Sequence, residues 1–410
     1  ATDALRELSR QFALPHGLGG APLVYLCGHS LGPLPRAARD IVAQELDDWG
    51  RLAVLGHEGA QRPWIPYHEH LRSGLEYLTG ARPGEVVAMN SLTVNLHLML
   101  ASFYRPAGRR TKILIEAHAF PSDRHAVASQ IAWRGLDPQS ELIELAPEDG
   151  SSLIAESAVE ELLRERGEEI AVVLWPGVQY LTGQAFDLAV IARAARRAGC
   201  VAGFDLAHAI GNVPLALHEA DADFAVWCSY KYLNGGPGAI GGCFVHERHG
   251  TDSGLPRLAG WWGHDPATRF EMGPEFWAAR GADGWQVSNP SILASAPLVA
   301  SLEIFRAAGM DRLRAKSVAL TGFLEQLLEP LPVTLLTPRE PAARGCQLSI
   351  RIGGTPGRGR RIFNALQSHG IVCDWREPDI IRVAPAPLYN RFEEVLHFGE
   401  RLAQALHTGP

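Results

Sequence analysis

A lysine between two apolar runs is the residue whose surroundings most strongly suggest chemistry. Lys231 follows the apolar run 224–228, and the run 241–245 comes soon after it. Both runs are typical of buried strands, and the segment between them is rich in glycine. A lysine at the end of a buried strand is desolvated, which favours the neutral amine that condenses with an aldehyde. Pyridoxal phosphate is held in this way; the alternative is a loop lysine that reaches solvent.

A carboxylate and an imidazole follow a second apolar run upstream. The run 200–206 predicts a strand that ends near Asp205, with His208 just beyond it. A carboxylate beside an apolar strand is costly unless it meets a cation. The protonated pyridine nitrogen of pyridoxal phosphate is such a cation. Asp205 and Lys231 therefore suit the two poles of one flat ring, although Asp205 could also be a helix cap.

Two further segments carry groups that suit a phosphate and an aromatic ring. A buried helix is expected to begin near Ser91 to Thr93, where free N–H groups and hydroxyls favour a phosphate. Plain capping of the helix is the alternative. Phe120 follows the expected strand 112–116 and could stack on a flat ring or belong to the core. Ser122 or Asp123 is expected to start the next helix.

These residues share one position relative to the expected strands. Strands and helices alternate across 86–245, which predicts a mainly parallel sheet with helices on both faces. Such sheets bind ligands beyond the carboxyl ends of their strands. The candidates that fall at or just past strand ends are Thr93, Phe120, Asp123, Asp205, His208 and Lys231.

The helix expected to begin at Pro35 and end at Trp49 precedes this region. Its apolar residues at helical spacing are Ala38, Ile41, Val42, Leu46 and Trp49. The stretch 50–67, which contains His57, is expected to be a loop, and a surface loop histidine is the simplest interpretation of His57.

The strings FDLAHA, CSYKYLNGG and GWWGH occur in this order and resemble kynureninases. These are fold-type I pyridoxal phosphate enzymes related to class V aminotransferases. The resemblance runs from YLCGHSLGPLP to IIRVAPAPLYN, nearly the whole chain. It implies an α/β fold with a mainly parallel, seven-stranded sheet flanked by helices, plus a smaller α+β domain. We expect 1–50 to contribute to the small domain, 51–295 to form the large domain, and 296–410 to form the small one.

The resemblance also implies roles for individual residues. Lys231 would form the Schiff base, Asp205 would pair with the pyridine nitrogen, and Tyr230 would bind the phosphate and serve as a proton donor. Arg382 would clamp the substrate carboxylate, for which a planar guanidinium is suited, unless it is a solvated strand-end arginine. The residues expected around the cofactor are Leu92, Thr93, Phe120, Pro121, Ser122, Asp123, His208, Trp261 and Asn289.

The active site of this family lies between two subunits, and Trp261 and Asn289 resemble positions that reach the cofactor from the second one. A homodimer is therefore implied. One departure concerns Pro176, since many relatives carry a hydroxyl residue there that contacts the cofactor, which proline cannot do.

The implied reaction is hydrolytic cleavage of the bond between the β- and γ-carbons of L-kynurenine or 3-hydroxy-L-kynurenine. The products are L-alanine and anthranilate or 3-hydroxyanthranilate. His57, Ser288 and Asn289 match the animal-type pattern, so we expect a preference for the 3-hydroxy substrate. The alternatives are another class V enzyme, either a cysteine desulfurase or an aminotransferase, and a cofactor-binding protein without catalytic activity.

Composition narrows the function classes further. A net charge of −7 and the lack of long Lys/Arg runs argue against a nucleic-acid partner. No stretch reaches eighteen apolar residues, so we expect no membrane span and a cytoplasmic enzyme. The six cysteines show no CxxC spacing, so we expect neither a metal site nor disulfides.

Overall fold

A seven-stranded sheet lies at the centre of the chain, of which the computed structural model describes residues 3–17, 19–252 and 254–408. The strands lie in the order β4-β10-β9-β8-β7-β5-β6. Their bounds are β4 Val86–Ala88, β5 Lys112–Glu116, β6 Leu142–Leu145, β7 Ile170–Pro176, β8 Val201–Asp205, β9 Phe224–Trp227 and β10 Gly242–Val245. Of these seven strands, β10 alone runs in the direction opposite to the other six. The prediction of a mainly parallel sheet is confirmed.

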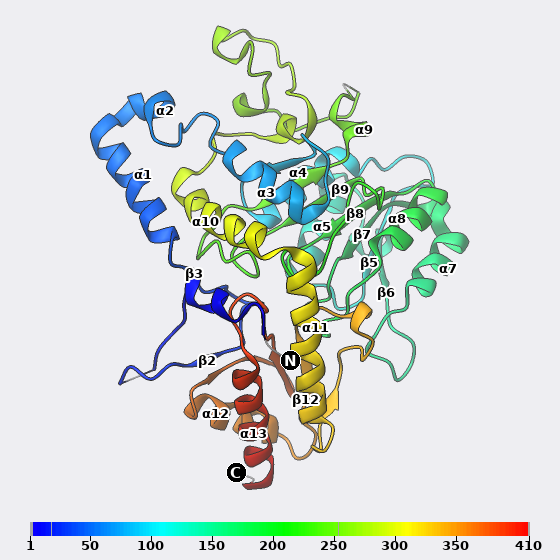
Figure 1. Ribbon diagram of the computed structural model, residues 1–410. Helices are drawn as coiled ribbons and strands as arrows, with labels where there is room; N and C mark the ends of the chain where they lie inside the picture. Colours follow the sequence, from blue (N-terminus) through cyan, green and yellow to red (C-terminus); the bar gives the residue numbers. More distant parts are fainter. Residues whose placement is uncertain (1–2, 18, 253, 409–410) are drawn as a thin grey trace.

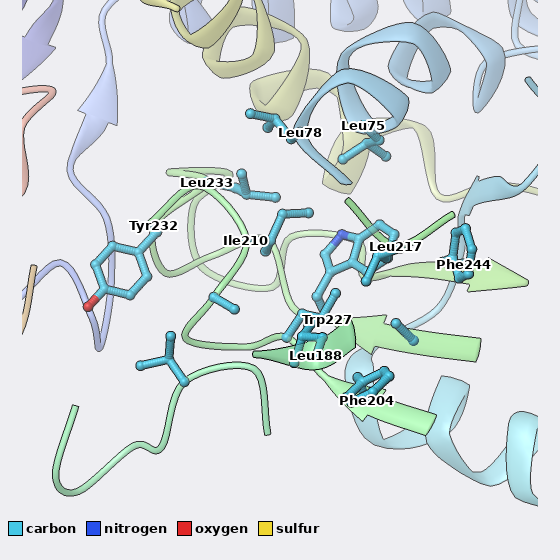
Figure 2. Close-up of a cluster of buried hydrophobic side chains, with 14 of the residues drawn as sticks. Leu75, Leu78, Leu188, Phe204, Ile210, Leu217, Trp227, Tyr232, Leu233 and Phe244 are labelled. Carbon is cyan, nitrogen blue, oxygen red and sulfur yellow. The ribbon is translucent and has the colours of Figure 1, made fainter. Parts of the chain in front are cut away.

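Both faces of this sheet are covered, which explains its continuous apolar strands. Successive side chains of a strand point to opposite faces. In β7, Val173 and Trp175 belong to one buried cluster, whereas Val172 and Leu174 belong to another. Figure 2 shows part of the first cluster, with Trp227 near its centre. The flanking helices are α3 Glu69–Thr79, α4 Leu92–Phe103, α5 Pro121–Trp133, α7 Glu156–Arg166, α8 Leu188–Arg197 and α10 Ile292–Ala308.

A smaller sheet with its own core forms the lower part of the molecule in Figure 1. Its strands, in order, are β11 Thr334–Leu335, β12 Leu348–Arg351, β15 Ile380–Val383 and β14 Asp374–Arg376. Its helices are α11 Met310–Leu328, α12 Arg358–Ser368 and α13 Phe392–Thr408. The early strand β2 Val24–Tyr25 pairs in parallel with β13 Ile371–Val372, so the N-terminal segment is joined to the C-terminal part.

The helix predicted from Pro35 to Trp49 differs from the structure in its start and in its buried face. It is α1 Ala38–Leu52, and it projects from the body of the molecule in Figure 1. Glu45 and Asp48 are buried in place of Leu46 and Trp49, which are exposed. The reason is that residues 61–67 supply hydrogen bonds to both carboxylates, including those from Tyr67 Oη to Glu45 and from the Gln61 amide to Asp48.

The stretch 50–67, predicted as a loop, contains two short helices, η2 Ala53–Leu55 and α2 Gly56–Gly59. The remaining short elements are η1 Arg6–Gln11, β1 Phe12–Ala13, β3 Leu34–Pro35, α6 Pro138–Glu141, η3 Gly167–Glu169, α9 Glu247–Gly250, η4 Trp261–Gly263, η5 Arg269–Glu271, η6 Gly281–Trp285 and η7 Pro341–Ala343. No single helix in the described ranges is long and apolar enough to cross a membrane. The pair α10 and α11 meets that criterion together but is bent by 83°.

Candidate active site

A cavity opens at the carboxyl ends of β5, β7, β8 and β9, where the sequence placed a ligand site. Its lining residues are Leu92, Thr93, Glu116, Phe120, Ser122, Asp123, Pro176, Val178, Tyr180, Asp205, Ala207, His208, Tyr230 and Lys231. Nine predicted site residues are thus brought to one place from segments up to 139 positions apart (231 minus 92). The cavity is where parallel strands direct the residues that follow them.

Lys231 lies beside His208 in this cavity. The Nζ atom of Lys231 is 3.0 Å from Nε2 of His208. Burial lowers the pKa of His208 well below its usual value, and the charges of Lys231 and Arg382 lower it further. The imidazole is therefore neutral, and its Nε2 accepts a hydrogen bond from Nζ of Lys231. Its buried Nδ1 has no hydrogen-bond partner among the described residues.

Two carboxyl groups meet at the base of the cavity. Asp205 ends β8, and its Oδ1 accepts a 2.6 Å hydrogen bond from the Ala207 amide. Asp123 is buried on α5, and its pKa is raised well above the usual range by burial, by the charge of Asp205 and by a hydrogen bond to it. Two buried acids joined by a hydrogen bond cannot both ionise without a compensating cation. The Oδ1 of Asp123 is unpartnered within the described part of the chain, so the pair fits a protonated pyridine nitrogen.

The first turns of α4 and α5 meet on another side of the cavity. Thr93 Oγ1 lies 2.7 Å from Ser122 Oγ, which joins the two helix starts. Ser91 is the N-cap residue of α4, but its side chain makes no capping hydrogen bond. Free amides and two hydroxyls at converging helix N-termini suit a phosphate group. Pro121, the first residue of α5, is not among the lining residues.

Phe120 stands at the cavity rather than in the core, since 41% of its surface is exposed. Its ring centroid is 5.8 Å from Nζ of Lys231, and the ring of Tyr180 meets it edge to face at 5.3 Å. The face of a flat cofactor could therefore stack on Phe120.

Arg382 is buried on β15, with 1% of its surface exposed, so it is not a solvated strand-end arginine. Its Nε donates to Asp374 Oδ2 at 2.6 Å, and its Nη1 donates to the Tyr180 carbonyl oxygen at 2.5 Å. Tyr180 lines the cavity, so the guanidinium is held by the backbone of a lining residue. Asp374 and Tyr180 were not singled out from the sequence.

Glu116 also lines the cavity and was missed. It ends β5 with 3% exposure, and Gln179 Nε2 donates to it at 3.4 Å. Burial raises the pKa of Glu116 to about 8. A polar residue at the end of an apolar strand, as at Asp205, was the signal that could have identified it. Pro176, flagged from the sequence, ends β7 and lines the same cavity.

Besides Pro121 and Arg382, four predicted residues do not line the cavity: His57, Trp261, Ser288 and Asn289. His57 lies on the projecting α2 and Trp261 on η4, where it is 44% exposed. Apolar side chains that are also exposed lie near them in the sequence: Trp49, Val54, Leu55, Phe270, Met272 and Trp277.

Comparison with solved structures shows a shared fold. The chain superposes on a mutant of C-DES with glycine covalently linked to its PLP cofactor, with a TM-score of 0.80 and 21% identity over 96% of this chain and 98% of the other. A cysteine desulfurase from Thermococcus onnurineus NA1 gives a TM-score of 0.75 and 17% identity, covering 94% of this chain and 95% of the other.

Comparison with curated sequences shows the family. A kynureninase from Xanthomonas euvesicatoria pv. vesicatoria is 56% identical over 405 residues, which cover 98% of this chain and 95% of the relative. A kynureninase from Xanthomonas campestris pv. campestris (strain B100) is 57% identical over 395 residues, covering 96% and 93%. Residues 313–402 match the family model described as Kynureninase C-terminal domain. The chain therefore belongs to the kynureninase family.

Proposed function

We propose that this protein is a pyridoxal phosphate-dependent hydrolase that cleaves the bond between the β- and γ-carbons of L-kynurenine or 3-hydroxy-L-kynurenine. The products are L-alanine and the corresponding anthranilate. The observation that carries this proposal is that the Lys231 amine and the Asp205–Asp123 carboxyl pair line one cavity. Family membership at 56–57% identity supports it independently.

Several residues of the cavity would hold the cofactor. Lys231 would attach to its aldehyde carbon, Asp205 with Asp123 would face the ring nitrogen, and Phe120 would stack on the ring. The phosphate-binding residues would be Leu92, Thr93, Ser122 and Tyr230. His208, neutral and next to Lys231, would lie beside the ring. When bound, pyridoxal phosphate supplies an electron sink for the carbon adjacent to the substrate amine.

The protein groups then manage protons and charge. The amine of Lys231 removes the proton from the substrate α-carbon, and the neighbouring Nε2 of His208 orients that amine. Burial raises the pKa of Tyr230, so its hydroxyl stays protonated and can donate a proton to the product. Arg382, fixed by Asp374, binds the substrate carboxylate through its free N–H groups.

The active enzyme is a homodimer in this proposal. His57, Trp261, Ser288 and Asn289 do not line the cavity of their own protomer, and the apolar side chains near them in the sequence are exposed. Exposed apolar side chains of this kind mark interaction surfaces, so the two segments 49–55 and 270–277 are the proposed contacts with the second subunit. A second subunit placed there would carry these residues to its partner's cavity.

We further propose a preference for the 3-hydroxy substrate. Its extra hydroxyl needs a polar partner, and a site that supplies one rejects the analogue lacking the hydroxyl. His57, Ser288 and Asn289 provide such groups.

A cysteine desulfurase is the alternative because proteins of that name share the fold. Desulfurases need a reactive cysteine at the site, yet no cysteine lines the cavity in the described residues. Cys228 is the nearest in sequence to Lys231; it is buried, and its pKa is raised by that burial. A thiol in this state is a poor nucleophile.

The deciding experiment is to add L-kynurenine to the purified holoenzyme and follow the fluorescence of released anthranilate. We expect release from the wild type and none from Lys231→Ala. Release of sulfide from cysteine, or formation of a keto acid without anthranilate, would assign the protein to another class V activity.

A further inference from the structure

His29 is a buried imidazole whose polar atoms are unsatisfied within the part of the chain that the structure describes. Only 1% of its surface is exposed, and neither Nδ1 nor Nε2 has a partner within the described ranges. A neutral imidazole carries one donor and one acceptor, and leaving both buried and unpaired is costly. A polar ligand of the site would offset this cost.

The turn that carries His29 connects the two poles of the active site. At its start, the Ala384 amide donates to the Leu26 carbonyl oxygen at 2.9 Å, which fixes the turn to the end of β15, the strand that carries Arg382. At its end, the Gly32 amide donates to the Tyr230 carbonyl oxygen at 2.8 Å, next to Lys231. The turn that carries His29 is therefore fixed at one end to the strand of Arg382 and at the other end to the residue before Lys231.

The surroundings of the His29 ring agree with this placement. On one side, its centroid is 6.4 Å from that of His208, the ring that contacts Lys231. On the other side, potential ligand atoms of Cys27, His29 and Asp374 lie within 4.8 Å of one another. Asp374 is the residue that holds Arg382.

The charge around this ring favours an anion over a metal ion. Cys27, His29 and Asp374 are residue types that bind metals, but Asp374 Oδ2 already accepts from Arg376 at 3.0 Å and from Arg382 at 2.6 Å. Burial lowers the pKa of His29 well below its usual value, and the charges of Arg382, Lys231 and Arg376 lower it further, in that order. Three cations against one carboxylate repel a metal ion and attract an anion.

We propose that His29 is a second residue that binds the α-carboxylate of the substrate, donating a ring N–H alongside Arg382. Three of the five guanidinium N–H groups of Arg382 are engaged, two with Asp374 and one with the Tyr180 carbonyl oxygen. Two remain for a bidentate contact, and His29 adds a third donor. The inference rests on the proposed function in so far as it assumes an amino-acid substrate.

The test compares two ligands that differ only by a carboxylate, L-alanine and ethylamine. Each is titrated into holoenzyme, and the change in the visible absorbance of the cofactor gives its Kd. We expect His29→Ala to raise the Kd for L-alanine by about 10- to 100-fold, the range for a hydrogen bond to a charged group, while the Kd for ethylamine stays within about twofold. His29→Asn keeps an N–H donor of similar reach and should lose less affinity for L-alanine than His29→Ala does.

The matched control is His97→Asn, because His97 is a partly buried histidine on α4 whose ring is hydrogen-bonded to Gln130 at 2.9 Å. It should leave both Kd values unchanged. If the His29 variants lose affinity equally for L-alanine and ethylamine, or lose none for either, the inference is overturned. If His29→Ala does not fold, His29→Asn provides the test. The proposed function is tested separately by anthranilate release from the wild type. A protein that passes the alanine test without releasing anthranilate binds a different amino acid.

Discussion

Replacing Glu116 by Gln should change how the stability of the protein depends on pH. The folded-state pKa of Glu116 is about 8, against an ordinary value of 4.5, because the side chain is buried. The folded protein therefore binds a proton that the unfolded chain releases between pH 4.5 and 8. Stability falls as pH rises through this window, since the folded state binds more protons. Gln cannot titrate, and it keeps the neutral shape that Gln179 contacts.

The size of this effect on stability follows from the difference of 3.5 pH units between the folded-state pKa of Glu116, about 8, and its ordinary value of 4.5. A pKa difference of one pH unit corresponds to about 1.4 kcal/mol, so the free energy of unfolding changes by about 5 kcal/mol across the whole window. Between pH 5.5 and 7.5 the free energy of unfolding of Glu116→Gln should rise by about 3 kcal/mol relative to the wild type. Below pH 4.5 and above pH 8 the difference should be constant.

The assay is urea unfolding of the cofactor-free proteins, followed by tryptophan fluorescence across pH 5 to 8. Glu160→Gln is the control, because Glu160 is an exposed carboxyl on α7 and its replacement should leave the pH profile parallel to that of the wild type. A parallel profile for Glu116→Gln would refute the reasoning and show that Glu116 is ionised in the folded protein.

Three further predictions concern the site and the subunit contact. Asp205→Asn keeps the side-chain shape but removes the charge that would face the ring nitrogen of the cofactor. Because one partner of a buried ion pair is then lost, kcat for anthranilate release should fall by about 100-fold or more, and the cofactor should be retained less tightly. His57→Phe should lower the ratio of kcat/KM for 3-hydroxykynurenine to that for kynurenine by about 10-fold, measured with both substrates. Trp49→Asp places a charge on an exposed apolar surface and should shift the protein from dimer to monomer in light scattering, with loss of activity.

Each of these has an outcome that contradicts it. Full kcat in Asp205→Asn would show that this carboxylate does not act at the cofactor site. Equal selectivity in wild type and His57→Phe would show that His57 does not determine the substrate preference. Trp133, on α5, is exposed to 67% and Trp49 to 60%, so Trp133→Asp is the matched control. A dimer that survives Trp49→Asp, or that is lost equally in Trp133→Asp, would exclude α1 as the specific contact.

The sequence by itself determined the sheet and one set of strand-end residues. A strand buried on both faces must be continuously apolar, so the first polar residue after it lies at the sheet edge. Asp205 is the polar residue that ends β8, and Lys231 follows the end of β9 by four positions; both line the cavity. The start of α8 at Leu188 is also local, because the neighbouring Asp187 accepts hydrogen bonds from the Ala189 and Val190 amides.

Only the tertiary structure decided which distant groups meet. Glu45 and Asp48 could be buried on α1 because residues 61–67 fold back to bind them, and periodicity alone cannot show such compensation. Arg382 can be buried because the fold brings two hydrogen-bond acceptors to it. One is Asp374, and the other is the carbonyl oxygen of Tyr180, which lies 202 positions away in the sequence. Hydrogen-bond partners that far apart depend on strand register and packing, whereas local patterns record only which residues are apolar.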